Sequence, residues 1–322
     1  MTRTPRHASV FGSARKRRSG ERRVLVEARA KVNLGLEVLG RRADGYHTLS
    51  SLLWAIDLAD RVTLEAASAG ITVTCDVPDV PLTEDNLAWR AADLVRHETG
   101  TAAGVRIHIQ KAIPVAAGLG GGSTDAAAVL AGLGGLWGHR LPPGRLRGLA
   151  QALGMDVPFF LGASPALASE RGEVLRPVAA RRAIPLVVVN PGFPVATRDV
   201  YARLEPGDFS DGAAVRALVR AARVGLPAVA GHLVNGLERA LSGLWPGLGE
   251  AKAALVEAGC LGAVLSGSGP TVIGVAPSRA AGQRVMARLR GRPWRLWATQ
   301  TVAGPALTMA VTGSAVGQRR RC

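Results

Sequence analysis

The segment from Pro114 to Thr124 has the most specific pattern of residues that could do chemistry, since it combines clustered glycines with two hydroxyl side chains. An alternating apolar run at 105–109 predicts a strand before it, and residues 125–131 predict a helix after it. Amides of a glycine-rich turn and of a helix start bind phosphate well. We therefore expect the phosphates of a nucleoside triphosphate to contact Pro114, Val115, Ala116, Ala117, Gly118, Leu119, Gly120, Gly121, Gly122, Ser123 and Thr124.

Two better-known glycine motifs do not fit this segment. The dinucleotide pattern begins at Gly118 and Gly120, but its last glycine position holds Ser123. The Walker pattern requires a lysine after the glycines, and none follows here. A flexible surface turn is the remaining alternative, although four glycines in the five positions 118–122 exceed what a turn needs.

Length and composition limit the class of protein. The chain has 322 residues, 48% of them hydrophobic, which suffices for one large domain or two ordinary ones. No run of eighteen uncharged apolar residues and no apolar signal-peptide core occurs. The three cysteines are scattered and lack metal-ligand spacing. These features predict a cytoplasmic, bacterial protein with no membrane attachment, the alternative being plastid import directed by the Ser/Arg-rich start.

The net charge of +16 is concentrated at the two ends of the chain. Residues 1–23 carry +7 and residues 319–321 carry +3, which leaves +6 for the rest. We expect residues 1–23 to form a disordered basic tail and residues 306–322 to form a second tail. Non-specific attraction to RNA is conceivable, but no aromatic RNP cluster or zinc knuckle predicts a specific nucleic-acid partner.

Lysine is rare among the basic residues, with only four in a total of forty. An ammonium can approach one oxygen closely and change its pKa on burial, which arginine cannot do. This draws attention to Lys31 and Lys111 as candidate functional residues.

Strand-like and helix-like segments are mixed without strict alternation, which predicts an α+β protein. We expect two domains, residues 24–180 and 181–305, with a boundary between Pro177 and Pro185. Expected strands are 24–28, 32–38, 49–56, 61–65, 71–75, 105–109, 166–169, 173–175, 186–189, 263–266, 271–275 and 294–299. Expected helices are 86–97, 125–131, 142–153, 213–224, 232–241, 248–258 and 280–289.

Three separated motifs resemble those of the galactokinase, homoserine kinase, mevalonate kinase and phosphomevalonate kinase (GHMP) superfamily. They are Ala-Lys-Val-Asn-Leu at 30–34 with Asp-Gly-Tyr-His at 44–47, the 114–124 loop, and a third glycine motif at Gly267, Ser268 and Gly269. The resemblance covers roughly residues 24–300. It implies a ribosomal protein S5 domain 2-like N-terminal domain and a ferredoxin-like C-terminal domain, with substrate and ATP between them.

The resemblance implies that Lys31 and Asp156 are the catalytic pair. Phosphoryl transfer to an alcohol needs a carboxylate to accept the hydroxyl proton and a cation nearby. It also implies Mg²⁺, with the hydroxyls of Ser123 and Thr124 as candidate ligands. From the residues alone, Asp156 could equally be a helix N-cap, and Lys31 could be a charge at a strand edge.

The Asp-Gly-Tyr-His sequence resembles the cytidine-binding loop of family members that phosphorylate the 2-hydroxyl of a cytidine diphosphate-linked methylerythritol, in the non-mevalonate route to isoprenoid precursors. Tyr46 would stack on the pyrimidine and His47 would bond to its polar edge. The second stacking ring would be Tyr201, with Thr197 beside it. The resemblance also places Asn33 at the substrate and, on the adenosine side, Asn86 and Lys111.

The chain departs from the family pattern at three places. Thr124 replaces a serine, Gly236 replaces a polar residue before Glu238, and residues 163–166 lack the usual glycines. A related small-alcohol kinase of the homoserine or mevalonate type is the nearest alternative, although a substrate without a pyrimidine has no need of Asp-Gly-Tyr-His. A basic RNA-binding module is a more distant alternative. The sequence is consistent with a monomer or a homodimer.

Overall fold

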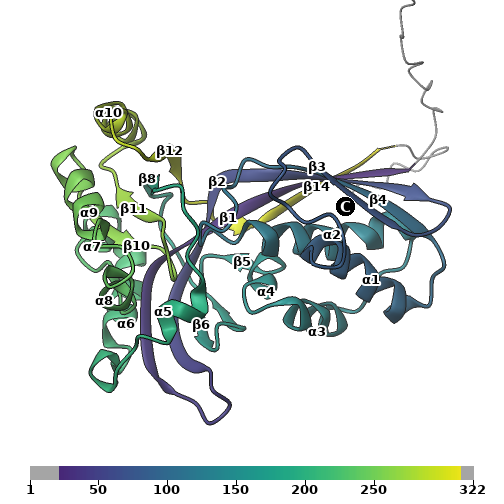
Figure 1. Cartoon of the computed structure of the whole chain (residues 1–322), viewed down its shortest axis with the longest axis horizontal. Coiled ribbons are helices and arrows are strands. Elements are labelled where there is room, and N and C mark those ends of the chain that lie inside the picture. Colours follow the sequence, from purple (N-terminus) through teal and green to yellow (C-terminus); the bar gives the residue numbers. More distant parts are fainter. Residues whose placement is uncertain (1–21, 313–322) are drawn as a thin grey trace, which may run out of the picture.

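Two long antiparallel strands run through both halves of the molecule (Figure 1). The computed structural model describes residues 22–312, so the expected basic tail at 1–23 lies almost entirely outside the described residues. Strand β1 (Arg23–Arg41) joins the two expected strands 24–28 and 32–38, and β2 (His47–Ala67) joins 49–56 and 61–65. Register shifts between Arg29 and Lys31 and between Asn33 and Gly35 interrupt their pairing. Such bulges re-aim side chains, here at the candidate catalytic segment.

The first sheet is built around this pair in the order β14-β1-β2-β4-β3, with β6 beside β2, β7 beside β6 and β9 beside β1. Helices α1 to α4 cover one of its faces (Figure 1). The strands are β3 (Ile71–Cys75), β4 (Gly104–Gln110), β6 (Ala166–Glu170), β7 (Val174–Pro177), β9 (Val234–Asn235) and β14 (Leu307–Thr312). The helices are α1 (Leu87–Thr99), α2 (Gly121–Trp137), α3 (Pro143–Leu153) and α4 (Val157–Phe160).

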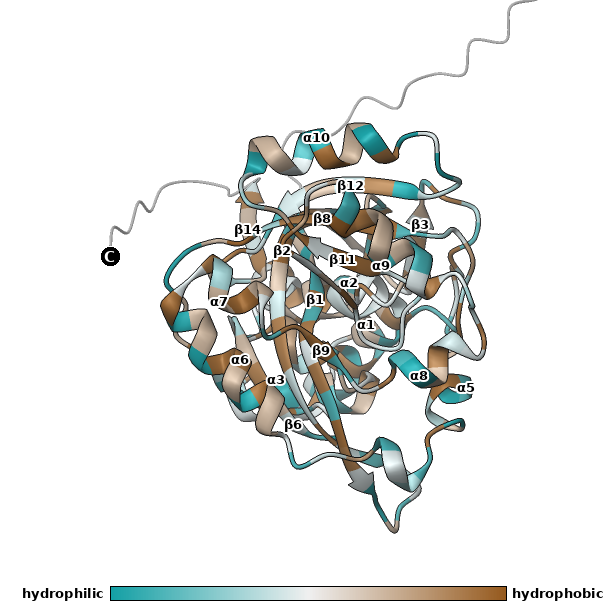
Figure 2. Cartoon of the chain, turned by 90° about the vertical axis from the view of Figure 1, so that its left-hand side faces the viewer, coloured by the Kyte–Doolittle hydropathy of each residue, from teal (hydrophilic) through white to brown (hydrophobic). Residues whose placement is uncertain are grey.

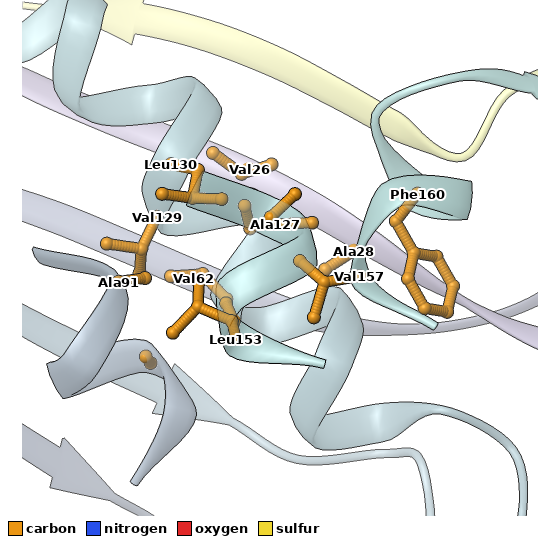
Figure 3. Close-up of a cluster of buried hydrophobic side chains, with 14 of the residues drawn as sticks. Val26, Ala28, Val62, Ala91, Ala127, Val129, Leu130, Leu153, Val157 and Phe160 are labelled. Atoms are coloured by element: carbon orange, nitrogen blue, oxygen red, sulfur yellow. The ribbon is translucent and has the colours of Figure 1, made fainter. Parts of the chain in front are cut away.

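Apolar side chains of β1, β2 and these helices form the first core (Figure 3). Val26 and Val62 of the two strands meet Ala127 and Leu130 of α2, and all four are at most 3% exposed. Burial of this kind of side chain contributes about 1.5–3 kcal/mol each. The core therefore holds the start of α2, which carries the glycine-rich segment, firmly against the sheet.

The second sheet is antiparallel with the order β10-β11-β8-β12. Its central strands β8 and β11 are hydrophobic along their length (Figure 2). They pack with residues of β1, including Leu34 and Leu36, in two further cores. The elements are β8 (Pro185–Asn190), β10 (Gly262–Leu265), β11 (Val272–Val275), β12 (Arg295–Gln300), α5 (Thr197–Tyr201), α6 (Ala213–Val224), α7 (Leu226–Ala230), α8 (Glu238–Ser242), α9 (Leu248–Glu257) and α10 (Arg279–Leu289), with a short pair β5 (Ala163–Ser164) and β13 (Gly304–Pro305) and a 3-10 turn (Pro206–Asp208).

The helix expected at 232–241 is wrong in its first half. Val234 and Asn235 form the parallel strand β9 beside Gly35 and Leu36, and only 238–242 is helical. The side-chain amide nitrogen of Asn235, Nδ2, donates to the carbonyls of Leu265 and Gly267 at 2.8 Å each. These contacts with distant segments outweigh the helical periodicity of the local sequence.

The expected tail at 306–322 is also wrong in its first part. Residues 307–312 form β14, which pairs with residues 23–28 of β1 along the edge of the first sheet. The uncharged, partly β-branched sequence of this strand suits an edge position, but its partner lies almost three hundred residues away in sequence. Residues 313–322 lie outside the described part of the chain.

Candidate active site

A cavity of about 990 Å³ lies where β1, the β1–β2 turn, the residues just before α4, α5 and both glycine motifs meet. It brings together residues that are far apart in sequence, and in Figure 1 α5 lies beside the hairpin made by β1 and β2. The predicted site residues that line it are Lys31, Asn33, Tyr46, His47, Gly118, Gly120, Ser123, Asp156, Thr197, Tyr201, Gly267 and Ser268. This cavity is therefore the candidate active site.

Lys31 and Asp156 face each other at the wall of this cavity. The Nζ atom of Lys31 lies 3.4 Å from Oδ2 of Asp156, and the lysine is 5% exposed, whereas the aspartate side chain is 42% exposed. Asp156 precedes α4, but its side chain makes no capping hydrogen bond to that helix. The helix-cap explanation of Asp156 therefore fails, and its carboxylate is free to meet a ligand.

Asn33 holds the Lys31 ammonium in place. Lys31 Nζ donates to Asn33 Oδ1 at 2.9 Å, and Asn33 Nδ2 donates to the hydroxyl of Ser51 at 2.7 Å. Ser51 in turn donates to the carbonyl of Gly35. This buried chain of hydrogen bonds fixes both the lysine and the asparagine, which sequence reasoning had assigned to substrate contact alone.

The two glycine motifs touch each other through their backbones. A Cβ atom on Gly118, whose φ is +75°, would lie 2.7 Å from the carbonyl oxygen of Gly269. Ser266 accepts a hydrogen bond from the backbone of Asn33, and the Thr271 hydroxyl donates to the carbonyl of Ala117. Glycine is needed at 118 both for the backbone conformation and for this close approach.

Within the 114–124 loop, residues alternate between the cavity and the core. Gly118, Gly120 and Ser123 line the cavity, while Ala117 and Leu119 are at most 2% exposed. The structure starts α2 at Gly121, so the helix begins inside the glycine run and earlier than expected. No side chain caps this helix start, which leaves its amides available to a phosphate.

Ser123 and Thr124 differ in their fit to a magnesium ion. Ser123 lines the cavity, but Thr124 is fully buried and its hydroxyl has no hydrogen-bond partner in the described residues. Among residues 22–312 no group of three or more acidic, histidine or cysteine side chains could hold a metal on its own. Mg²⁺ usually keeps substrate phosphates and waters as ligands, so one hydroxyl fits it, whereas the burial of Thr124 argues against its predicted contact.

Lys111 and Asn86 do not line the cavity. Asn86 caps α1 by accepting from the amide of Ala88 and donating to the carbonyl of Pro81. Lys111 Nζ lies 2.5 Å from Asp60 and 2.8 Å from Asp125, and all three side chains are at most 5% exposed. Both residues have structural partners here, and their predicted adenosine contacts stay untested.

The aromatic end of the cavity is arranged differently from the expected pair of tyrosines. The rings of His47 and Tyr201 lie 5.2 Å apart, while Tyr46 is 52% exposed and lies under the guanidinium of Arg171 at 5.2 Å. Burial, helped by the charge of Asp156, raises the pKa of the Tyr201 phenol. Burial and the nearby Arg41 lower the pKa of His47, which favours the neutral imidazole at pH 7.

Sequence reasoning missed the arginines of the cavity. Arg41, Arg171 and Arg198 line it together with Lys31, and Asp156 is the one carboxylate among the described lining residues. Arg171 is held by Glu173, whose carboxylate accepts from its Nε and its backbone amide. Arginine is so common in this chain that no sequence signal marked these three. The cavity is consequently suited to anionic ligands.

The departures at 236 and 163–166 have structural explanations away from the reacting groups. Glu238 accepts from the amide of Leu265 and pairs with Lys252 at 2.5 Å, so this acid supports the second sheet. Ser164 accepts from the amide of Ala55 and donates to the carbonyl of Val302.

None of the helices between residues 22 and 312 is long and apolar enough to cross a membrane.

Curated relatives match this chain over most of its length, and two family models match one segment each. The model described as "GHMP kinases N terminal domain" matches residues 86–163, and "GHMP kinases C terminal" matches residues 217–295. A 4-diphosphocytidyl-2-C-methyl-D-erythritol kinase of Synechococcus sp. is 44% identical over 85% of this chain and 92% of its own length. The enzyme of that name from Symbiobacterium thermophilum is 43% identical over 86% of this chain and 99% of its own.

Solved structures give the same grouping. A crystal structure of a 4-(cytidine 5'-diphospho)-2C-methyl-D-erythritol kinase is 39% identical, with a TM-score of 0.76 over 87% of this chain and all of that chain. A homoserine kinase from Cytophaga hutchinsonii has a TM-score of 0.72 over 94% of this chain and all of its own, but only 19% identity. The second likeness concerns the fold alone.

The buried cluster around Lys111 generates a prediction about stability and pH. Burial raises the pKa of Asp125 to about 7, and the charge of Asp60 acts in the same direction, whereas the charge of Lys111 opposes this rise. The Cys75 thiol also interacts electrostatically with Asp125. Between the ordinary carboxyl pKa of about 4 and this value, the folded protein holds a proton that the unfolded chain has released. The contribution of Asp125 to the free energy of unfolding therefore falls as the pH rises from about 4 to about 7.

The side chain in Asp125→Asn cannot titrate, so we expect this variant not to lose stability as the pH rises through this range. The Tm of the variant minus that of the wild type should rise from pH 5 to pH 7 and then level off. Thermal melts of both proteins at pH 5, 6, 7 and 8 provide the measurement. A Tm difference that stays constant across this range would show that burial does not raise this pKa.

Proposed function

Because the chain belongs to the GHMP kinase family, and within it to the 4-diphosphocytidyl-2-C-methyl-D-erythritol kinases, we propose that it transfers the γ-phosphoryl group of ATP to the 2-hydroxyl of 4-diphosphocytidyl-2-C-methyl-D-erythritol. This reaction is a step of the non-mevalonate route to isoprenoid precursors. Membership also confirms the expected α+β, two-domain GHMP kinase fold. The observation that carries the catalytic assignment is the 3.4 Å contact of Lys31 with Asp156 in the cavity.

Asp156 accepts the proton of the substrate hydroxyl in this proposal. Its carboxylate is partly exposed to the cavity, where it lies 3.4 Å from the Lys31 ammonium and can be reached by a substrate hydroxyl. Lys31 also faces the oxygen on which negative charge develops as that proton leaves. The hydrogen bond from Lys31 to Asn33 keeps the ammonium in one orientation before and during transfer.

The nucleotide phosphates lie along the loop 118–123 in this proposal. The uncapped amides at the start of α2 and the close backbone of Gly118 and Gly120 support this position. Ser123 would hold Mg²⁺ together with phosphate oxygens, and the bound ion supplies neutralisation of phosphate charge. The hydroxyl of Ser268 lies 2.8 Å from that of Thr197 and links the third glycine motif to α5.

The substrate's cytidine diphosphate fits the other end of the cavity. Tyr201 offers a ring face for the pyrimidine, and neutral His47 can donate or accept at its polar edge. Arg41, Arg171 and Arg198 match the negative charge of a diphosphate. Homoserine and mevalonate have a carboxylate but no pyrimidine for the rings of His47 and Tyr201 to contact, which favours the cytidine-linked acceptor over those alternatives.

The base role of Asp156 predicts the outcome of Asp156→Asn. We expect kcat to fall by roughly 10²–10⁴-fold, because the amide cannot accept the hydroxyl proton. The dissociation constant of ATP should stay within about threefold, since the phosphates bind the separate loop 118–123. Steady-state kinetics and ATP titration measure these two quantities. Asp93→Asn on α1, outside the cavity, is the control and should retain wild-type kinetics. A variant that keeps more than about a tenth of wild-type kcat contradicts the base role.

The stacking role of Tyr201 predicts a selective effect on one substrate. Tyr201→Ala should raise the KM of the cytidine-linked acceptor on the order of ten- to a hundredfold, since stacking contributes about 1–3 kcal/mol per base. Tyr201→Phe keeps the ring and should leave the KM of the cytidine-linked acceptor nearly unchanged. The KM of ATP should change by less than about threefold in both variants. Kinetics with each substrate varied in turn decide the matter, and equal damage to both KM values would assign Tyr201 to the fold instead.

A further inference from the structure

A buried charge cluster lies directly behind the phosphate-binding loop and outside the cavity. Lys111 is enclosed by Asp60 of β2 and Asp125 of α2, and the exposed fractions of the three side chains are 5%, 0% and 4%. The ammonium lies 2.5 Å from Asp60 Oδ2 and 2.8 Å from Asp125 Oδ2. Its donors thus point at protein carboxylates and away from the cavity.

The cluster ties the first sheet to the start of α2. Asp60 Oδ1 accepts from the backbone amides of Ala112 and Ile113, so this carboxylate fixes the segment that leads into the glycine loop. Asp76, at the end of β3, accepts from the backbone amide of Lys111. Lys111 then reaches across to Asp125, five residues into α2. One ammonium therefore links β2, the entry to the loop and the helix that leaves it.

The first residue of α2 packs directly on this ammonium. A Cβ atom on Gly121 would lie 3.1 Å from Lys111 Nζ and 3.1 Å from Ile113 Cγ2. The absence of a side chain at Gly121 lets the cluster lie next to the backbone whose amides face the phosphates. A shift of the ammonium would thus displace the amides of the first turn, which are the phosphate donors proposed above.

The cluster is a costly way to stabilise a fold. Two carboxylates share one cation, and both Asp125 Oδ1 and the neighbouring Thr124 hydroxyl are buried without a hydrogen-bond partner in the described residues. Burying charges costs several kcal/mol per ion and is repaid only by full pairing. A positioning role explains why charged groups, and not apolar ones, fill this space.

We propose that Lys111, with Asp60 and Asp125, is a positioning residue for the phosphate-binding loop and that it acts on the triphosphate through Gly121–Ser123, without contacting adenosine. This inference rests on the proposed kinase function. Lys111 makes the loop rigid in the arrangement that aligns its amides, so its loss weakens recognition of phosphates and leaves recognition of the nucleoside intact.

The test compares two probes of the nucleotide site, inorganic tripolyphosphate and adenosine, by titration calorimetry and by competition with ATP. We expect Lys111→Met to weaken tripolyphosphate binding on the order of tenfold, the effect of about one misaligned hydrogen bond. Adenosine inhibition should stay within about twofold of wild type, and so should the KM of the acceptor. Asp125→Asn, which keeps the shape of the side chain, should also weaken tripolyphosphate binding, by roughly threefold.

Leu133→Ala is the matched control for lost stability, because Leu133 lies on the same helix and is fully buried in the first core. It should lower Tm without changing the ratio of tripolyphosphate to adenosine affinity. If Lys111→Met fails to fold, Asp125→Asn decides the question. Weakened adenosine binding with unchanged tripolyphosphate binding overturns the proposal, as does a pattern identical to that of Leu133→Ala. A wild-type protein that binds tripolyphosphate but does not phosphorylate the acceptor contradicts the proposed function alone.

Discussion

The backbone of β1 at Lys31 and Asn33 is hydrogen-bonded to both glycine motifs, and the site depends on this arrangement. The amide of Lys31 donates to the carbonyl of Leu119 at 2.9 Å, and the amide of Asn33 donates to the hydroxyl of Ser266 at 3.1 Å. Lys31 and Asn33 stay in register with Ala55 and Leu53 of β2, while their own amides bond to two loops that are about 150 residues apart in sequence. Lys31, the proposed catalytic lysine, thereby lies between the 114–124 loop and the third glycine motif.

Lysine is used sparingly, and the three described lysines all meet carboxylates. Lys31 faces Asp156 in the cavity, Lys111 is enclosed by Asp60 and Asp125, and Lys252 pairs with Glu238. Arginine is used on the surface and around the cavity suited to anionic ligands, where a large planar cation suffices. A compact ammonium is needed where one oxygen must be approached closely beside a glycine backbone. The rarity of lysine was therefore an informative signal, although it could not distinguish catalysis from positioning.

The sequence predicted those parts of the site that depend on local motifs. The strand, glycine loop and helix around Gly118 are contiguous, and Lys31 and Asp156 each belong to a short recognisable pattern, so both could be assigned. Pairings between distant segments could not be predicted. The partner of Tyr201 is His47 and not Tyr46, because the β1–β2 turn places Tyr46 under Arg171. Strands β9 and β14 were missed for the same reason, since β1 supplies their hydrogen bonds from far along the chain.

The central claim is that this site phosphorylates a cytidine diphosphate-linked alcohol with ATP. The most direct measurement follows ATP consumption by the full chain with three acceptors in parallel, namely 4-diphosphocytidyl-2-C-methyl-D-erythritol, homoserine and mevalonate, and identifies the product by phosphorus NMR. The account predicts turnover of the first acceptor with a new phosphomonoester at its 2-hydroxyl, and background rates with the other two. Comparable kcat/KM for homoserine or mevalonate, or no phosphorylation of the cytidine-linked acceptor, would contradict it.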